Sequence, residues 1–225
     1  TYVCGACAKE TALKLKELML ENAAKIYRVP KELIEMKGGY IRVKGDKESQ
    51  RTYGEMAFEI QKLNKTELYV SHEYESKANP GSYAAHFAEV IVDTYIGLVT
   101  VNDYLAVHDI GKAINPGFVE GQILGGVQMG IGMALYEEIK FDAKGKPIND
   151  SFSKYHVVNA PDMPEVKVLL IEEGEDYGPY GAKSIGELCT VPVAPAIVNA
   201  VNDALGTKLS SLPLTPEKIL AAIER

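Results

Sequence analysis

Apolar residues recur at helical spacing over residues 6–27, and this pattern predicts an amphipathic helix. The segment 30–36 predicts a further short turn of helix, and residues 40–43, which follow two glycines, predict a strand. Thr52 and Glu55 have the spacing of a capping box, so another short helix is expected directly after them. This part of the chain therefore mixes helices with short strands.

Beyond residue 82 the pattern changes from helical spacing to alternation. Residues 86–93 alternate as a strand, residues 94–97 form a turn, and an apolar return strand follows. The pattern predicts a long antiparallel pair of strands. Four apolar positions of the return strand are expected on one face: Val99, Val101, Leu105 and Val107.

Asn79, Pro80 and Gly81 lie between these two regions, and such clusters favour turns and loops over regular structure. We therefore expect a boundary within residues 77–82. It would separate a first lobe over residues 1–78 from a second lobe over residues 79–225. The predicted fold class is α+β, with two lobes of mixed sheet and helices.

The segment 117–138 has the length and apolar content of a helix, yet it contains six glycines. Each interior glycine costs a helix about 0.8–1 kcal/mol relative to alanine, so something must compensate. The expected compensation is close approach of the backbone to another helix or to a ligand. A phosphate-binding glycine loop is less favoured, because Gly130 and Gly132 lie inside the segment rather than between a strand and a helix.

Two glutamines, Gln122 and Gln128, lie among these glycines. A side-chain amide has two donor hydrogens and an acceptor oxygen, so it can bind the edge of a heterocycle such as a pterin or a base. The alternative is that each is an exposed helix glutamine without a ligand. The sequence pattern leaves both interpretations open.

Composition and charge exclude several classes of protein. The chain has 225 residues, 46% of them hydrophobic, which is enough for a substantial core. Its net charge of −7 argues against nucleic acid or an anionic membrane as the main partner. No apolar run approaches the roughly 20 residues of a membrane span, and the first residues lack a basic secretory region. Because the chain begins without Met, we expect a fragment or a processed subunit.

The three cysteines, Cys4, Cys7 and Cys189, cannot form a disulfide framework, and an odd number is typical of a reducing compartment. We therefore expect a cytoplasmic protein. Cys4 and Cys7 have the spacing of half a zinc site or of a redox pair, but no second half is present. Small buried thiols are the favoured interpretation of both.

Glu187 is the first candidate for a catalytic group. It ends the run Gly-Ala-Lys-Ser-Ile-Gly-Glu over residues 181–187 and is followed by an apolar, proline-containing segment. Apolar surroundings raise the pKa of a carboxylic acid and make its carboxylate a usable base. The alternative is a structural glutamate at a helix entry, where the positive end of the helix dipole favours a carboxylate.

Five segments in this order resemble the C-terminal part of the molybdenum-binding subunit of molybdenum hydroxylases, the family of xanthine dehydrogenase and aldehyde oxidoreductase. Together they extend over much of the chain, and their combination is far more specific than any one of them. Met129 is a departure, because many relatives have Gln there. The segments are residues 109–116, 120–138, 181–187, 192–204 and 212–220.

The resemblance implies a molybdopterin-dependent hydroxylase in which a glutamate takes the proton from a molybdenum hydroxyl group. The oxygen then attacks an electron-poor carbon, hydride moves to a sulfido ligand, and water supplies the oxygen atom. Glu187 matches that base, and the pterin dithiolene rather than a side chain holds the metal. The residues that match cofactor-contacting positions are Gln122, Lys183, Ser184, Ile185, Gly186, Thr1 and Gly5.

The resemblance also implies partners. The family's upstream loop that reaches the metal from the opposite side is absent, so a second molybdenum-binding half is expected and the isolated chain should be inactive. Three cysteines cannot hold two [2Fe–2S] clusters, so iron–sulfur and FAD groups are expected on partner subunits of an oligomer. The cofactor is expected as molybdopterin or its cytosine dinucleotide.

The implied substrate is a purine, another N-heterocycle such as nicotinate, or an aldehyde. Two alternatives come from other classes: a non-catalytic cofactor-binding or assembly module of the same fold, and an ordinary α+β nucleotide-binding protein. The absence of a glycine loop between a strand and a helix disfavours the second alternative.

Overall fold

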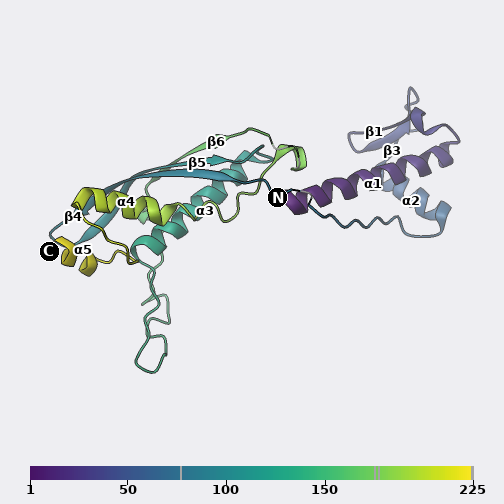
Figure 1. The fold of residues 1–225 in the computed structure, drawn as a ribbon. Coiled ribbons are helices and arrows are strands. Elements are labelled where there is room, and N and C mark those ends of the chain that lie inside the picture. Colours follow the sequence, from purple (N-terminus) through teal and green to yellow (C-terminus); the bar gives the residue numbers. More distant parts are fainter. Residues whose placement is uncertain (77, 175, 177, 224–225) are drawn as a thin grey trace. The chain divides into compact units, whose positions relative to one another are not determined.

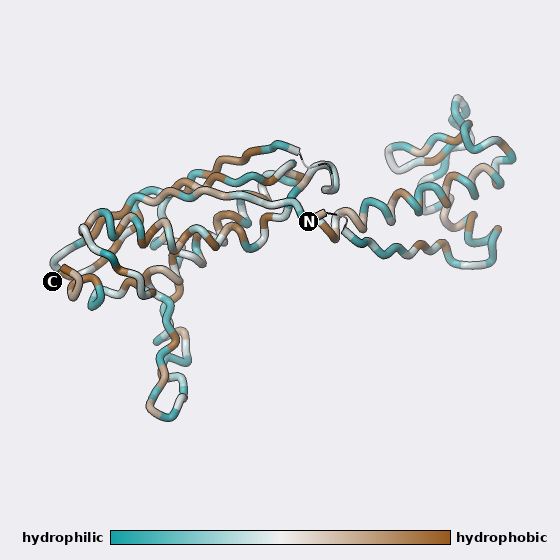
Figure 2. Tube along the Cα trace, in the orientation of Figure 1, coloured by the Kyte–Doolittle hydropathy of each residue, from teal (hydrophilic) through white to brown (hydrophobic). Residues whose placement is uncertain are grey.

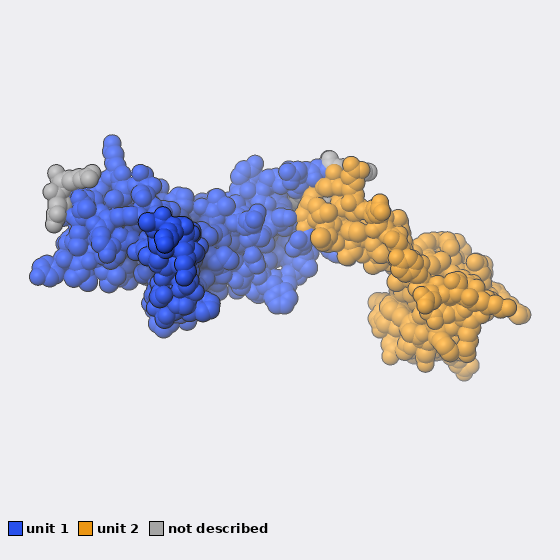
Figure 3. All heavy atoms as spheres, turned by 90° about the horizontal axis from the view of Figure 1, so that it is seen from below, with its two compact units in different colours: residues 1, 78–225 blue, residues 2–77 orange. Residues whose placement is uncertain are grey.

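The computed structural model describes residues 1–76, 78–174, 176 and 178–223. They divide into two units, shown in different colours in Figure 3. Unit 2 comprises Tyr2–Lys77, and unit 1 comprises Thr1 and Ala78–Arg225. Each unit combines helices with a three-stranded sheet, so the predicted α+β class is confirmed. None of the described helices is long and apolar enough to cross a bilayer.

Unit 2 packs two helices against a small antiparallel sheet of order β1-β2-β3 (Figure 1). Its core joins both helices to the sheet through Met19, Ala23, Ile34, Ile41, Met56 and Ile60. Its elements are α1 (Tyr2–Tyr27), the 3-10 turn η1 (Lys31–Leu33), β1 (Ile34–Lys37), β2 (Tyr40–Val43), β3 (Arg51–Thr52) and α2 (Tyr53–Asn64).

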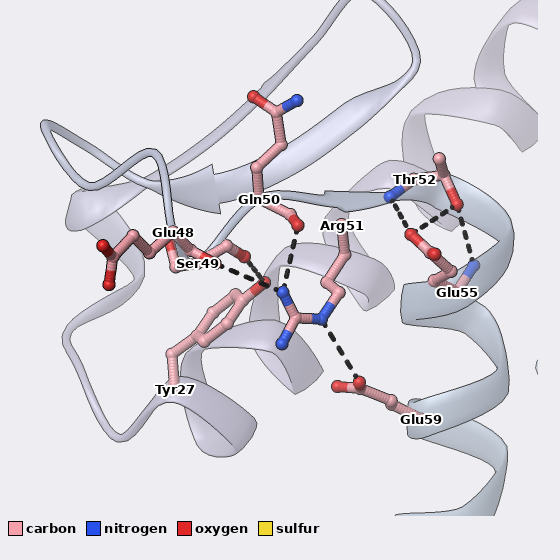
Figure 4. A network of polar contacts seen from close by, with 8 residues as sticks. All are labelled: Tyr27, Glu48, Ser49, Gln50, Arg51, Thr52, Glu55 and Glu59. Atoms are coloured by element: carbon pink, nitrogen blue, oxygen red, sulfur yellow. Dashed lines mark hydrogen bonds and ion pairs between the residues drawn. The ribbon is translucent and has the colours of Figure 1, made fainter.

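Three of the local predictions for unit 2 are confirmed and one is confirmed in part. The long first helix, the strand over 40–43 and the capping box are present; Thr52 N–H donates to a Glu55 carboxylate oxygen at 2.8 Å (Figure 4). Of the turn of helix predicted within residues 30–36, Lys31–Leu33 are a 3-10 turn, whereas Ile34–Lys37 are a strand because they pair antiparallel with Tyr40–Val43. Figure 4 also shows the Tyr27 hydroxyl donating to the Ser49 carbonyl at 2.6 Å, which ties α1 to the segment before β3.

Unit 1 contains a sheet of order β4-β5-β6 in which β4 and β5 are antiparallel and β5 and β6 are parallel. Helices α3 and α4 lie on the same side of this sheet (Figure 1). The elements are β4 (Tyr83–Asp93), β5 (Leu98–Asp109), α3 (Pro116–Leu135), η2 (Ala160–Asp162), β6 (Glu165–Ile171), η3 (Pro179–Gly181), α4 (Val193–Leu205) and α5 (Pro216–Ile223).

A bulge in the β4–β5 pair corrects the predicted face of the return strand. Glu89 pairs with Asp103, whereas Val90 pairs with Val101, so the alternation on β5 shifts at this point. Val99 and Val101 are buried on the helix side, as predicted, but Leu105 and Val107 lie on the other side. Their places on the helix side are taken by Tyr104, Ala106 and His108, which are all buried.

The glycine-rich segment is a helix over Pro116–Leu135, as predicted, and its glycines are of two kinds. A Cβ at Gly126 would lie 2.4 Å from the Cys189 Cβ, and one at Gly130 would lie 2.3 Å from the Val193 Cβ. Here close helix packing is confirmed. Gly121 and Gly125 are exposed, and a Cβ at either would meet no described atom within 4 Å.

The cysteines differ in their exposure. Cys189 is fully buried between α3 and the turns before α4, as expected for a structural thiol, and burial raises its pKa to about 11. Cys7 is partly buried, and its thiol donates to the His72 carbonyl at 3.4 Å. Cys4 is exposed, so the prediction of a buried thiol there is wrong: it lies on a solvent-facing side of α1.

A cluster of three polar rings lies on the helix side of the sheet in unit 1. His86 Nε2 and His108 Nε2 are 2.8 Å apart, and His86 Nδ1 lies 2.9 Å from the Tyr104 hydroxyl. His108 is fully buried, and its Nδ1 has no hydrogen-bond partner among the described residues. Burial lowers the pKa of both histidines, that of His86 to about 4 with a further contribution from His108.

We expect opposite effects from alanine at two neighbouring glycines of α3. Gly126→Ala should destabilise unit 1 by roughly 1–3 kcal/mol or more, because its methyl group would overlap with Cys189. Gly125→Ala should stabilise it by up to about 1 kcal/mol through helix propensity alone. Denaturant unfolding of the 225-residue chain measures both. Equal destabilisation by the two substitutions would contradict the packing described here.

Acid should destabilise unit 1 through its two histidines. Unfolded histidines bind protons below about pH 6.5, whereas folded His86 does so only near pH 4. The unfolded state therefore binds more protons between these values, and stability that is complete above pH 6.5 is lost as the pH falls. We expect a loss on the order of 2 kcal/mol. His86→Gln should flatten the pH dependence of the unfolding free energy.

Candidate active site

A cavity of about 630 Å³ in unit 1 is formed by three segments: the loop after β5, the first half of α3, and residues 182–187. The structure brings together nearly all the predicted site residues here, namely Thr1, Gln122, Lys183, Ser184, Ile185, Gly186 and Glu187. Gly5 lies on α1 in unit 2, so its predicted contact with the cofactor stays a prediction. Sequence reasoning did not single out Ile110, Lys112, Ile114, Asn115, Phe118 and Val119, which also line the cavity.

Two glycines allow the loop after β5 to approach the segment before α4. Gly111 has a positive φ of +64°, and a Cβ there would lie only 2.2 Å from the Gly181 carbonyl oxygen. Gly181 itself has a φ of 85°. Next to this contact, Lys183 N–H donates to the Ile110 carbonyl at 2.9 Å. A side chain at Gly111 would therefore separate the two segments that form the cavity.

An ion pair holds the same two segments together. Lys183 Nζ lies 2.6 Å from Asp109 Oδ2, and the two side chains are only 12% and 18% exposed. The other carboxylate oxygen of Asp109 accepts from Gly111 N–H at 3.2 Å. Removal of either partner of such a shielded pair leaves a charge without its counterion and destabilises the fold.

Three successive carbonyl groups of the loop accept hydrogen bonds from three different segments of the chain. The Ser82 hydroxyl donates to the Ser184 carbonyl at 2.8 Å, and the Cys189 thiol donates to the Ile185 carbonyl at 2.8 Å. Gln122 Nε2 donates to the Gly186 carbonyl at 3.1 Å. The backbone that leads to Glu187 is therefore held by Ser82, directly before β4, by Gln122 of α3 and by Cys189 in the turns after Glu187.

Glu187 lies at the edge of the cavity and is exposed. Its carbonyl accepts from Thr190 N–H at 3.0 Å, and consecutive turns continue to Val193, where α4 begins. Glu187 thus precedes the helix by several residues, and the helix-entry interpretation is wrong. The prediction of apolar surroundings is also wrong for the described residues, because the Glu187 side chain faces solvent.

One end of the cavity, at the start of α3, can attract an anion. Lys112 and Lys183 line it, and Lys112 forms an ion pair with Glu172 at the end of β6. The N-terminus of α3 also faces the cavity, with Asn115 as N-cap and its Oδ1 accepting from Phe118 N–H at 3.2 Å. Each lysine is already paired with a carboxylate, so the group left to attract an anion is the N-terminus of α3, which suits a phosphate.

The two glutamines of α3 have different roles. Gln122 lines the cavity and uses one amide hydrogen on the Gly186 carbonyl. Gln128 is not among the lining residues; its amide donates to the Val158 carbonyl at 2.8 Å, on the loop before β6. The structure therefore brings only Gln122 to the candidate site.

Comparison with known proteins identifies relatives of this fold and site. Residues 1–164 match the molybdopterin cofactor-binding domain family. The chain is 34% identical over 223 residues to the xanthine dehydrogenase molybdenum-binding subunit of Escherichia coli O157:H7, covering 97% of this chain and 30% of that protein. It is 30% identical over 237 residues to the nicotine 6-hydroxylase large subunit of Paenarthrobacter nicotinovorans, with coverages of 98% and 28%.

A solved structure agrees with these relatives. Carbon monoxide dehydrogenase from Oligotropha carboxidovorans superposes with a TM-score of 0.76 at 26% identity, over 96% of this chain and 28% of that one. The chain thus spans less than a third of the length of the relatives it matches. With its motifs, its fold and a family match over most of its length in agreement, the chain belongs to the molybdopterin-binding family of xanthine dehydrogenase-type molybdenum-binding subunits.

Proposed function

We propose that this chain forms one wall of the active site of a molybdopterin-dependent hydroxylase, with Glu187 as general base. The observation that supports this most directly is the position of Glu187 on the cavity, at the end of a loop held by one ion pair and several hydrogen bonds. A base needs a fixed position relative to the proton that it takes, and such a loop supplies it.

Molybdopterin, when bound, supplies a metal centre that accepts two electrons and activates a water-derived oxygen as nucleophile. The residues proposed to hold it are Gln122, Lys183, Ser184, Ile185 and Gly186, with Thr1 and Gly5. The N-terminus of α3 favours its negative charge. The exposed amide groups of the loop can donate hydrogen bonds to its pterin ring.

Glu187 accepts, at a carboxylate oxygen, the proton that the nucleophile loses as it adds to an electron-poor carbon of the substrate. Gln122, Ser82 and Asp109 act on this step only by holding the loop. We propose a purine or another N-heterocycle as the substrate, because relatives are named for xanthine and for nicotine; an aldehyde is the second candidate.

We also propose partner polypeptides, because this chain covers less than a third of the length of its relatives. A second molybdenum-binding half is proposed to close the cavity from its open side, since the chain spans about 30% of the relative's length. Iron–sulfur and FAD groups on partner subunits would remove the electrons. The three free cysteines favour a cytoplasmic, reducing location, and the cofactor is proposed as molybdopterin or its cytosine dinucleotide.

The hydrogen bond from Gln122 should control the order of the loop. Gln122→Ala removes the donor to the Gly186 carbonyl, so amide hydrogen exchange should accelerate, by about tenfold, for the amides of residues 186–190. Gln128→Ala is the matched control: it breaks a similar bond from the same helix and should accelerate exchange only near Val158. Unchanged exchange in the 186–190 segment of Gln122→Ala would show that the bond does not position the loop.

Glu187→Gln should abolish turnover of the assembled enzyme and leave its molybdenum content nearly unchanged. The amide has the same shape but cannot accept the proton, and a positioned base contributes about 10²–10⁴-fold to the rate. The experiment measures molybdenum content and kcat per molybdenum atom. Near-normal turnover, or a loss only in proportion to lost metal, would instead favour the alternative of a non-catalytic cofactor-binding module.

A further inference from the structure

The sheet of unit 1 has a second face, opposite α3 and α4, which we call the outer face. The pairing of β4, β5 and β6 brings its side chains into transverse rows, three residues to a row. Three rows at one end are mainly apolar, and the fourth carries three carboxylates. The rows are Tyr83, Asp109 and Ile171; Ala85, Val107 and Leu169; Phe87, Leu105 and Lys167; and Glu89, Asp103 and Glu165.

The apolar rows face solvent in this chain. Tyr83 is 70% exposed, Phe87 59%, Leu169 55% and Ile171 45%. A sheet with one solvated face normally alternates apolar and polar residues, whereas strands covered on both faces are apolar throughout. Figure 2 shows hydrophobic stretches in the strands as well as in α3 and α4. The composition of the outer face is thus that of a covered surface.

The outer face also has a hollow and an excess of negative charge at one margin. A hollow of about 270 Å³ lies between the apolar rows and the acidic row, lined by Phe87, Leu105 and Lys167 among others. Lys167 pairs with Asp103 at 2.7 Å, which leaves the row with an excess of negative charge from Glu89 and Glu165. A complementary surface would have an apolar centre and basic groups at one margin.

The apolar end of this face adjoins the candidate active site. Asp109, in the first row, is the counterion of Lys183, and Ser82, next to Tyr83, donates to the Ser184 carbonyl. A polypeptide that covered Tyr83 and Ile171 would therefore lie next to the loop that carries Glu187. The same end of the sheet leads into the cavity through Ile110.

We propose that the outer face docks the polypeptide that supplies the remainder of the molybdenum-binding subunit, through an apolar surface with basic residues opposite Glu89 and Glu165. The proposal rests on the proposed function. It is supported by the length of the relatives, of which this chain covers about 30%, and by the continuity of the face with the open cavity. The docked polypeptide would supply the surroundings that Glu187 lacks in this chain.

A second copy of this chain is a less suitable occupant. Each copy carries a net charge of −7, and a two-fold axis through the outer face would place the acidic row of one copy against the apolar or acidic rows of the other. Self-association through Phe87 would nevertheless be detected in the experiment below, and it would overturn the proposal.

The test uses the 225-residue chain and, as a separate polypeptide, the remaining part of the subunit encoded in its own genome. Hydroxyl-radical footprinting of the chain alone and of the mixture compares two tyrosines of the same hairpin. Tyr83 lies on the outer face, and Tyr95 lies at the turn and is 91% exposed. We expect protection of Tyr83 and Phe87 in the mixture and unchanged labelling of Tyr95. This measurement needs no variant.

Variants then measure the contribution of the face. Phe87→Thr and Leu169→Thr keep a residue suited to a strand but remove the apolar group, and each should weaken binding of the separate polypeptide by about tenfold. Tyr95→Thr is the control and should bind normally. Molybdenum content of the assembled protein is measured in parallel, so that a docking failure is distinguished from a failure of the proposed function.

Protection of Tyr83 and Phe87, together with weakened binding by both variants, supports the proposal. Three results overturn it: a complex that forms with normal affinity in both variants, a chain that dimerises through Phe87 and does not bind the polypeptide, or equal labelling of Tyr83 with and without it. A complex that contains molybdenum but leaves the outer face labelled would overturn the docking surface and retain the proposed function.

Discussion

The close approach of Gly111 to Gly181 is the constraint on which the candidate site depends. It allows the loop after β5 and the loop before α4 to lie in contact, and the Asp109–Lys183 ion pair then holds them there. The ion pair, the hydrogen bonds to successive carbonyls and the position of Glu187 all presuppose this backbone contact. The side-chain contacts of the cavity therefore depend on this backbone geometry.

Much of the fold could be predicted from local pattern. The helical spacing of 6–27, the capping box at Thr52 and the glycine-rich helix all depend on interactions within a few residues, and each is present in the structure. The strand over 34–37 was missed because its pairing with Tyr40–Val43, rather than its own periodicity, determines its conformation. The motif order identified the family, which the fold and its relatives support.

The site could be predicted as a set of residues but not as a network. Lys183, Ser184, Ile185, Gly186 and Glu187 were found because they adjoin one another in a motif. The contacts of the site could not be predicted from neighbouring residues, because they join distant parts of the chain: Asp109 pairs with Lys183, and Ser82 bonds to Ser184. The exposure of Glu187 was also missed, because burial depends on everything packed around a residue, including surfaces outside this chain.

The bulge between β4 and β5 has a consequence for how insertions and deletions would act on this protein. It sets the phase of the second half of β5, so that His108 faces the helices while Asp109 faces away from them and meets Lys183. Deletion of Asn102, the unpaired residue of the bulge, would only restore regular alternation, whereas deletion of one residue after the bulge, such as Ala106, would reverse the phase beyond it and turn Asp109 toward the core. The second deletion would remove the anchor of the loop that carries Glu187, so the part of β5 after the bulge should tolerate substitution far better than a change in length.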